Sequence, residues 1–275
     1  MAYETMQDVL IDIEKCGQIM GPLYYAFTKW WEGKATHRAF AAMRGGYPIL
    51  QAARIATANK FANVQCEPLW INRDVSEKLH TLSAREYIEK NKLNKEPFTL
   101  LDTGYRGTIS CNLKNNGAEV QALLISSVYE STHEGFFNET LGKDISEFEV
   151  HALEKIFEKL PCKFRDFDAR DIGDTSKLIW ENPNMLEAEK SFYKGFTQGV
   201  LDSARYQKTP NKKQLIAHYL TLEKNKTVIA DTCELLRRLR FDNSGKIVNC
   251  DSIYASKEQQ AGFTNAHRKI EKLYE

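Results

Sequence analysis

The stretch from residue 98 to 110 constrains the fold of this chain more than any other. It reads Phe-Thr-Leu-Leu-Asp-Thr-Gly-Tyr-Arg-Gly-Thr-Ile-Ser, and its uncharged start is typical of a buried strand in a covered parallel sheet. Asp102 falls at the carboxyl end of that strand, while Gly104 and Gly107 allow positive φ and let backbone amides face an anion. Thr108 is placed to cap the helix that follows. The stretch predicts a phosphate-binding loop, with a strand-to-helix turn that binds nothing as the alternative.

The composition is that of a globular protein whose partners are not selected by overall charge. The chain has 275 residues, 42% of them hydrophobic and 27% charged, which is enough to bury a sizeable core. Its net charge is +1, so the surface as a whole does not attract nucleic acid or a membrane. If the acceptor were a nucleic acid, the basic clusters Lys212-Lys213 and Arg237-Arg238 with Arg240 would be the phosphate contacts to test.

The cysteines and the first residues indicate a reducing compartment. The six cysteines are scattered, without a Cys-x-x-Cys pair or a clustered histidine, so neither a zinc site nor a thioredoxin-like motif is supported. Glu4 and Asp8 do not suit a signal peptide, and no apolar run reaches the roughly 18 residues of a membrane span. We therefore expect a cytoplasmic protein without a membrane segment.

Alternating strand and helix patterns predict a mainly parallel α/β sheet in the first half of the chain. Before it, helical spacing runs up to Gly17, and a second, aromatic-rich helix begins at Pro22 and is ended by Gly33. Asn72-Arg73-Asp74 follows the second strand, and His133 follows the last. The expected strands cover 37–43, 65–71, 98–101 and 120–129, and the expected helices cover 48–58, 83–91 and 108–115.

The sequence pattern changes in the second half of the chain and there predicts a helical extension or cap. Helical periodicity with many charges covers 147–160, 185–205, 211–224 and 226–240. We expect an α/β phosphate-binding domain with N-terminal helices over 1–140 and a mostly helical part over 141–275.

An apolar strand followed by Asp-x-Gly occurs in several phosphate-handling folds, so partner motifs must choose among them. A haloacid-dehalogenase-type phosphatase needs a second Asp two residues after the nucleophile, where this chain has Gly104. Asp166, Asp168, Asp171 and Asp174 are candidates for that family's metal ligands, but an acidic exposed loop is the favoured explanation of this cluster. An actin-like ATPase needs a second phosphate hairpin far downstream, which Ile172-Gly173-Asp174 supplies poorly.

A second glycine turn favours a third family. Met43-Arg44-Gly45-Gly46-Tyr47 follows a predicted strand upstream of Asp102 and resembles the Leu-Lys-Gly-Gly-Tyr peptide of purine phosphoribosyltransferases. Asp102-Thr103-Gly104 resembles the Asp-Thr-Gly of the same enzymes, although Leu101 stands where they carry a second acid. Over most of residues 20–205 the chain also resembles the domain that follows the phosphatase domain in some large bacterial haloacid-dehalogenase-type proteins. That domain carries the motif Arg-Asp-Gly-Tyr, and in this chain Gly45 stands in place of the Asp.

The resemblance implies a pentosyl or glycosyl transferase that uses an activated sugar phosphate, Mg²⁺ and a nucleotide-related acceptor. Asp102 would hold ribose hydroxyls or a Mg²⁺-bound water, and Arg44 with the Gly45 and Gly46 amides would hold the departing pyrophosphate. Arg73, Asp74 and His133 are expected near the acceptor. A phosphohydrolase with Asp102 as nucleophile and a non-catalytic nucleotide-binding module stay open. The implied 5-phosphate-binding residues are Thr103, Gly104, Tyr105, Arg106, Gly107 and Thr108.

Overall fold

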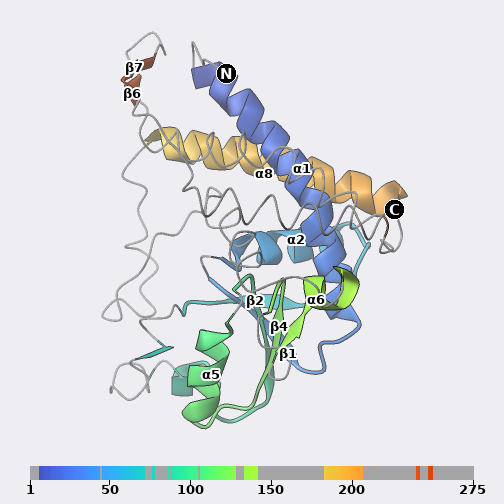
Figure 1. Cartoon of the computed structure of the whole chain (residues 1–275), viewed down its shortest axis with the longest axis vertical. Coiled ribbons are helices and arrows are strands. Elements are labelled where there is room, and N and C mark those ends of the chain that lie inside the picture. Colours follow the sequence, from blue (N-terminus) through green and yellow to red (C-terminus); the bar gives the residue numbers. More distant parts are fainter. Residues whose placement is uncertain are drawn as a thin grey trace. The chain divides into compact units, whose positions relative to one another are not determined.

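An alanine-rich apolar run, Arg38–Ala42, forms the first strand of a parallel sheet in the computed structural model of this chain (Figure 1). The structure describes residues 6–43, 45–71, 76–77, 86, 88–104, 106–127, 133–141, 183–206, 213, 240–241 and 247–249. The elements are α1 (Met6–Glu32), β1 (Arg38–Ala42), α2 (Tyr47–Ala58), β2 (Cys66–Leu69), β3 (Phe98–Asp102), α5 (Thr108–Asn115), β4 (Val120–Leu124), β5 (Glu134–Gly135), α6 (Phe136–Leu141), α8 (Pro183–Tyr206), β6 (Arg240–Phe241) and β7 (Ile247–Asn249).

These elements belong to two compact units. One unit contains α1 as far as Ala26 together with α8 and the short antiparallel pair β6 and β7. The other contains the last turns of α1, from Phe27, and all elements from β1 to α6. The candidate site lies entirely in this second, sheet-bearing unit.

The sheet confirms the expected α/β class. Its five strands are all parallel and stand in the order β2-β1-β3-β4-β5. The chain moves from β1 outward to β2 and then returns past β1 to β3, so the direction of strand progression reverses between β1 and β3. In open parallel sheets such a reversal leaves a crevice at the carboxyl ends of the two strands, where ligands bind.

Both faces of the sheet are covered around β1 and β3, which explains why these strands are mostly apolar. Phe40 and Leu100 pack with Leu113 of α5 on one face, while Ala41 packs with Leu50 of α2 on the other. Neighbouring residues of a strand point to opposite faces, so each strand needs apolar side chains at successive positions. The central strand β3 is therefore buried and uncharged as far as Leu101, whereas the edge strand β2 exposes Glu67.

The N-terminal segment is a single helix, and the expected break between Gly17 and Pro22 is wrong. Pro22 lacks the amide that would bond the carbonyl of Gln18. Gly199 of α8 approaches that same carbonyl so closely that an added Cβ would lie 2.4 Å from its oxygen. The helix thus continues through Pro22 where it packs closely against α8, a tertiary contact that sequence propensity could not reveal.

The crossing of α1 and α8 depends on glycines from both helices. A Cβ on Gly17 would lie 2.0 Å from the backbone oxygen of Phe192, and one on Gly21 would also meet α8 backbone atoms. A Cβ on Gly195 would lie 1.8 Å from the backbone oxygen of Glu14. Because the obstacles are backbone atoms, these helices approach too closely for any side chain at the contact.

Other expectations are confirmed in part. The predicted strand 120–129 ends at Leu124, because the carbonyl of Ile125 accepts a hydrogen bond from Phe137 in α6 and not from a strand. The predicted helix 185–205 is α8, and the described residues within 83–91 are helical up to 90. The expected helices 147–160, 211–224 and 226–240 lie outside the described residues except for Lys213, which is helical, and Arg240, which begins β6.

Candidate functional site

The two glycine turns singled out in the sequence leave the sheet side by side. β1 ends at Ala42 and β3 at Asp102, and these two strands are direct parallel neighbours. Their carboxyl ends therefore open on the same edge, at the reversal of strand order. The turn that begins at Met43 and the loop that begins at Thr103 both start from this edge.

The turn after β1 touches the loop after β3. A Cβ on Gly45 would lie 2.6 Å from Oγ1 of Thr103 and 3.5 Å from Oδ1 of Asp102. Thr103 is buried and Asp102 is partly exposed. The two motifs are therefore in direct contact; Arg44, the residue before Gly45 in the sequence, lies outside the described residues.

The backbone of Gly46 forms the hydrogen bonds that build the turn between β1 and α2. Its amide donates a hydrogen bond to the carbonyl oxygen of Ala42 at 2.7 Å, and an added Cβ would lie 2.4 Å from that oxygen. Its own carbonyl accepts the first bond of α2, from Leu50. Of the expected pyrophosphate donors, the amide of Gly46 is thus engaged in the protein, which leaves Gly45 and Arg44 for that role.

The Asp102 carboxylate is held by the loop that follows it. Its Oδ1 accepts a hydrogen bond from the amide of Thr103 at 2.8 Å. A Cβ on Gly104 would lie 3.0 Å from its Oδ2, so the backbone folds closely over the carboxylate. Gly104 does not have the positive φ that we expected; its small size is needed for this close approach instead. A second acid at position 104, as in haloacid-dehalogenase-type phosphatases, would crowd the first.

The end of the loop has the geometry of an anion-binding helix start. Gly107 is the N-cap of α5 and has a φ of 62°, so its left-handed conformation requires glycine. Thr108 is the first residue of α5 and makes no capping hydrogen bond, so the prediction that Thr108 caps the helix is wrong. The first amides of a helix have no carbonyl partner within it and carry partial positive charge. Arg106 is exposed beside them, and Tyr105 lies outside the described residues.

His133 lies beneath this helix start. Its side chain is only 3% exposed, and its Nε2 is 2.7 Å from Oγ of Ser110 on α5. Burial lowers its pKa, and the positive charge of Lys114 lowers it further. A ring so enclosed has no surface for an acceptor, so the geometry does not suit the ligand-facing role expected for His133. Arg73 and Asp74, also expected near the acceptor, lie outside the described residues.

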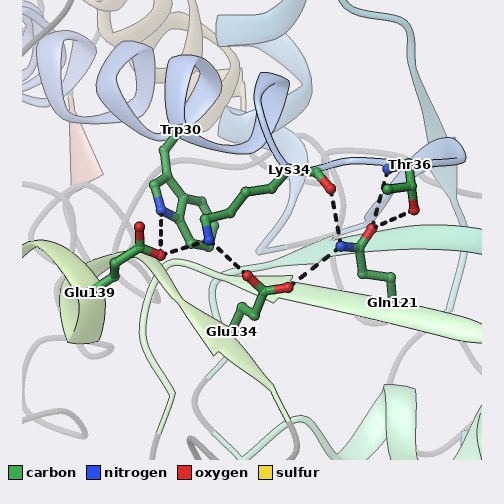
Figure 2. A network of polar contacts seen from close by, with 6 residues as sticks. All are labelled: Trp30, Lys34, Thr36, Gln121, Glu134 and Glu139. Carbon is green, nitrogen blue, oxygen red and sulfur yellow. Dashed lines mark hydrogen bonds and ion pairs between the residues drawn. The ribbon is translucent and has the colours of Figure 1, made fainter.

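Polar contacts hold the segment after His133 in place (Figure 2). Nζ of Lys34 pairs with Glu134 at 2.9 Å and with Glu139 at 2.8 Å, and these carboxylates raise the pKa of Lys34. The indole Nε1 of Trp30 also donates to Glu139, at 3.1 Å. This Lys34 network joins the end of α1 to β5 and α6, and it thereby fixes the backbone that carries His133.

Asn138 holds the backbone just after β4 with two hydrogen bonds. The Asn138 side chain accepts a hydrogen bond from the amide of Ser127 at 2.8 Å and donates one to its carbonyl at 2.6 Å. No spacing in the sequence links Ser127 to Asn138, nor Ser110 to His133. Only the placement of β5 beside β4 could reveal these pairs.

The described residues fit a metal ion that arrives with a substrate. Within the part of the chain that the structure describes, no three His, Cys, Asp or Glu side chains gather as a metal site. Mg²⁺ commonly keeps several waters and takes one or two carboxylates together with substrate phosphates. Asp102, a single carboxylate at the crevice, suits a water-mediated contact of that kind.

Searches with the chain find no match among protein-family models, among curated proteins or among solved structures. Of the helices that the structure describes, none is both long and apolar enough to cross a membrane. The function is therefore argued from the geometry of the β1 and β3 loops.

Proposed function

We propose that this chain is a phosphoribosyltransferase-like pentosyl or glycosyl transferase that acts on a nucleotide-related acceptor. The supporting observation is the contact of Gly45 with the corner formed by Asp102 and Thr103. It brings a pyrophosphate-type turn and a phosphate-type loop together at the reversal of strand order, where an activated sugar phosphate carries both groups.

In this proposal each loop binds one end of the activated sugar phosphate, either its 5-phosphate or its pyrophosphate. The first-turn amides of α5, from Gly107 onward, bind the sugar 5-phosphate, because they combine unpaired donors with a positive helix end. Arg44 and the amide of Gly45 bind the pyrophosphate and stabilise the charge that develops as it leaves. Asp102 orients the ribose hydroxyls. Mg²⁺ carried by the diphosphate would neutralise part of the charge on the leaving group.

Binding of the donor tests this assignment. Isothermal titration with phosphoribosyl pyrophosphate and Mg²⁺ should show saturable binding, and Arg44→Ala and Asp102→Asn should each weaken it by about tenfold or more, the usual scale for a charged hydrogen bond. Arg54→Ala, on the exposed side of α2, and Asp202→Asn, on α8, are matched controls that should bind as the wild type does. Absence of binding, or equal binding by all variants, would refute the proposal.

A non-catalytic nucleotide-binding module is the second candidate. It is favoured by the single acid of the loop, since Leu101 directly precedes Asp102 and Gly104 stands two residues after it. This candidate predicts that phosphoribosyl pyrophosphate or a nucleotide raises the melting temperature without any release of pyrophosphate. Release that depends on an added acceptor base and on Asp102 would favour the transferase instead.

A further inference from the structure

The buried pair of His133 and Ser110 lies where it can control the phosphate loop. His133 is 3% exposed and Ser110 is 1% exposed, and they come from different parts of the chain, the segment before β5 and the first turn of α5. Their side chains meet directly below Gly107. A Cβ on Gly107 would lie 2.3 Å from Nε2 of His133 and 2.6 Å from each of the two flanking ring carbons.

The hydrogen bonds run in one direction through this pair. Oγ of Ser110 donates its only proton to the carbonyl of Gly107 at 2.8 Å. With Ser110 donating to Gly107, Nε2 of His133, 2.7 Å from the same Oγ, is the donor to that oxygen in the Nε2–H tautomer, which is the tautomer that the proposal requires. The Gly107 carbonyl also accepts the first helical bond, from Cys111 at 2.9 Å. The imidazole, the hydroxyl and the carbonyl thus form one chain of donors and acceptors that ends on the N-cap of α5.

We propose that His133 is the positioning residue of the phosphate loop, acting through Ser110 on the carbonyl of Gly107. The proposal rests on the proposed function for the identity of the anion. A peptide unit has its carbonyl and amide fixed in one plane, so holding the carbonyl of Gly107 also sets the direction of the amide of Thr108. That amide is the first of the α5 donors, and preorganised donors bind an anion without reordering.

The surroundings of His133 favour the neutral ring that this role uses. The titratable and charged groups near it on α5 are Cys111, whose Sγ is 3.7 Å from Nε2, and Lys114. Burial and the charge of Lys114 both lower the pKa of His133. Glu134, the next residue, is bonded to Lys34. Both effects favour the neutral ring, and the hydrogen bond to Ser110 is the contact that would hold its proton on Nε2.

Variants that separate the donor from the ring test the proposal, with ribose 5-phosphate as the titrated probe. His133→Phe keeps an aromatic ring but removes the donor, and it should weaken binding by about tenfold. His133→Gln places an amide N–H near the position of Nε2 and should restore affinity to within about threefold of the wild type. Equal weakening by both variants, or by neither, would overturn the proposal.

The series of hydrogen bonds from His133 through Ser110 to Gly107 allows a second test. Ser110→Ala should weaken ribose 5-phosphate binding as much as His133→Phe does, and the double variant should lose nothing further, because the two residues act in series. Additive losses would mean that each acts independently. Thr99→Val, which removes a buried hydroxyl bonded to Gln121 at 2.9 Å, is a control for general loss of packing and should leave affinity unchanged.

Nuclear magnetic resonance of the imidazole nitrogens separates this role from the function itself. If the wild type binds no ribose 5-phosphate, the proposed function fails. The neutral Nε2–H tautomer of His133, and faster amide exchange at Cys111 in His133→Phe, would still establish the positioning of Gly107. A ring protonated on Nδ1 alone would overturn the proposal whatever the ligand result.

Discussion

The contact between the two loops can be tested by adding one carbon atom. In Gly45→Ala the new Cβ would lie 2.6 Å from Oγ1 of Thr103, well inside the roughly 3.5 Å at which non-bonded heavy atoms pack. The φ of Gly45 is not in the left-handed region, so alanine adds no backbone strain. The effect of the substitution therefore reports the contact with Thr103.

Two opposing effects set the expected change in the free energy of unfolding for Gly45→Ala. Crowding in a packed site costs about 1–3 kcal/mol, and the lower flexibility of the unfolded alanine chain returns about 0.4–1 kcal/mol. We expect Gly45→Ala to lower the free energy of unfolding by about 1–2 kcal/mol. In a Thr103→Ala background the obstructing oxygen is absent, and the nearest remaining atom of another residue is Oδ1 of Asp102 at 3.5 Å, an ordinary contact. There Gly45→Ala should be neutral or slightly stabilising.

Urea unfolding followed by tryptophan fluorescence gives the four free energies of this cycle. Trp30, Trp31 and Trp70 belong to the sheet-bearing unit, whereas Trp180 belongs to the other unit, so the cycle is measured in a Trp180→Phe background. If the effects of Gly45→Ala and Thr103→Ala add within about 0.5 kcal/mol, the two loops do not touch and the reasoning is refuted. Gly33→Ala is the control: its Cβ would meet nothing nearer than 3.7 Å, so its effect should be small and additive.

Two further predictions concern the helix crossing and the buried histidine. Gly195→Ala should lower the melting temperature of the α1–α8 unit by circular dichroism, with a loss of about 2 kcal/mol or more, because the new Cβ would strike the carbonyl of Glu14; an unchanged midpoint would refute the crossing. The pKa of His133 is lowered on folding, so the unfolded chain takes up its proton first and stability falls as the pH drops below about 6.5. His133→Gln should reduce that fall between pH 7.5 and 5.5, and equal slopes in urea unfolding would contradict this.

The strands were predictable because the sheet is covered on both faces. Runs such as Phe98 to Leu101 contain no charge, and the glycine turns after them mark the carboxyl edge. The sequence predicts that the two motifs lie near each other, because each stands at the end of a strand and both resemble parts of one donor site. The contact of Gly45 with Thr103 needed the pairing of β1 with β3.

The misses share a physical cause: a tertiary contact overrides a local preference. Pro22 ordinarily begins or ends a helix, but α1 continues through it where Gly199 approaches the carbonyl of Gln18. His133 looked like a loop residue near a ligand, yet the parallel pairing of β5 with β4 brings it under α5. In both cases the contacting element is remote in sequence: α8 lies far from Pro22 along the chain, and α5 lies more than fifteen residues before His133.

The glycines of the site deserve less functional weight than the sequence suggested. Gly46 is required by the carbonyl at the end of β1, Gly104 by the carboxylate of Asp102, and Gly107 by its positive φ and the imidazole beneath it. Each would be needed for packing even in a protein that binds no phosphate. Asp102 also has a structural role, because its carboxylate accepts the Thr103 amide, but Asp102→Asn keeps an oxygen that can accept this bond and removes only the charge. The titration of Asp102→Asn and Arg44→Ala therefore tests the function, whereas glycine variants test only the fold.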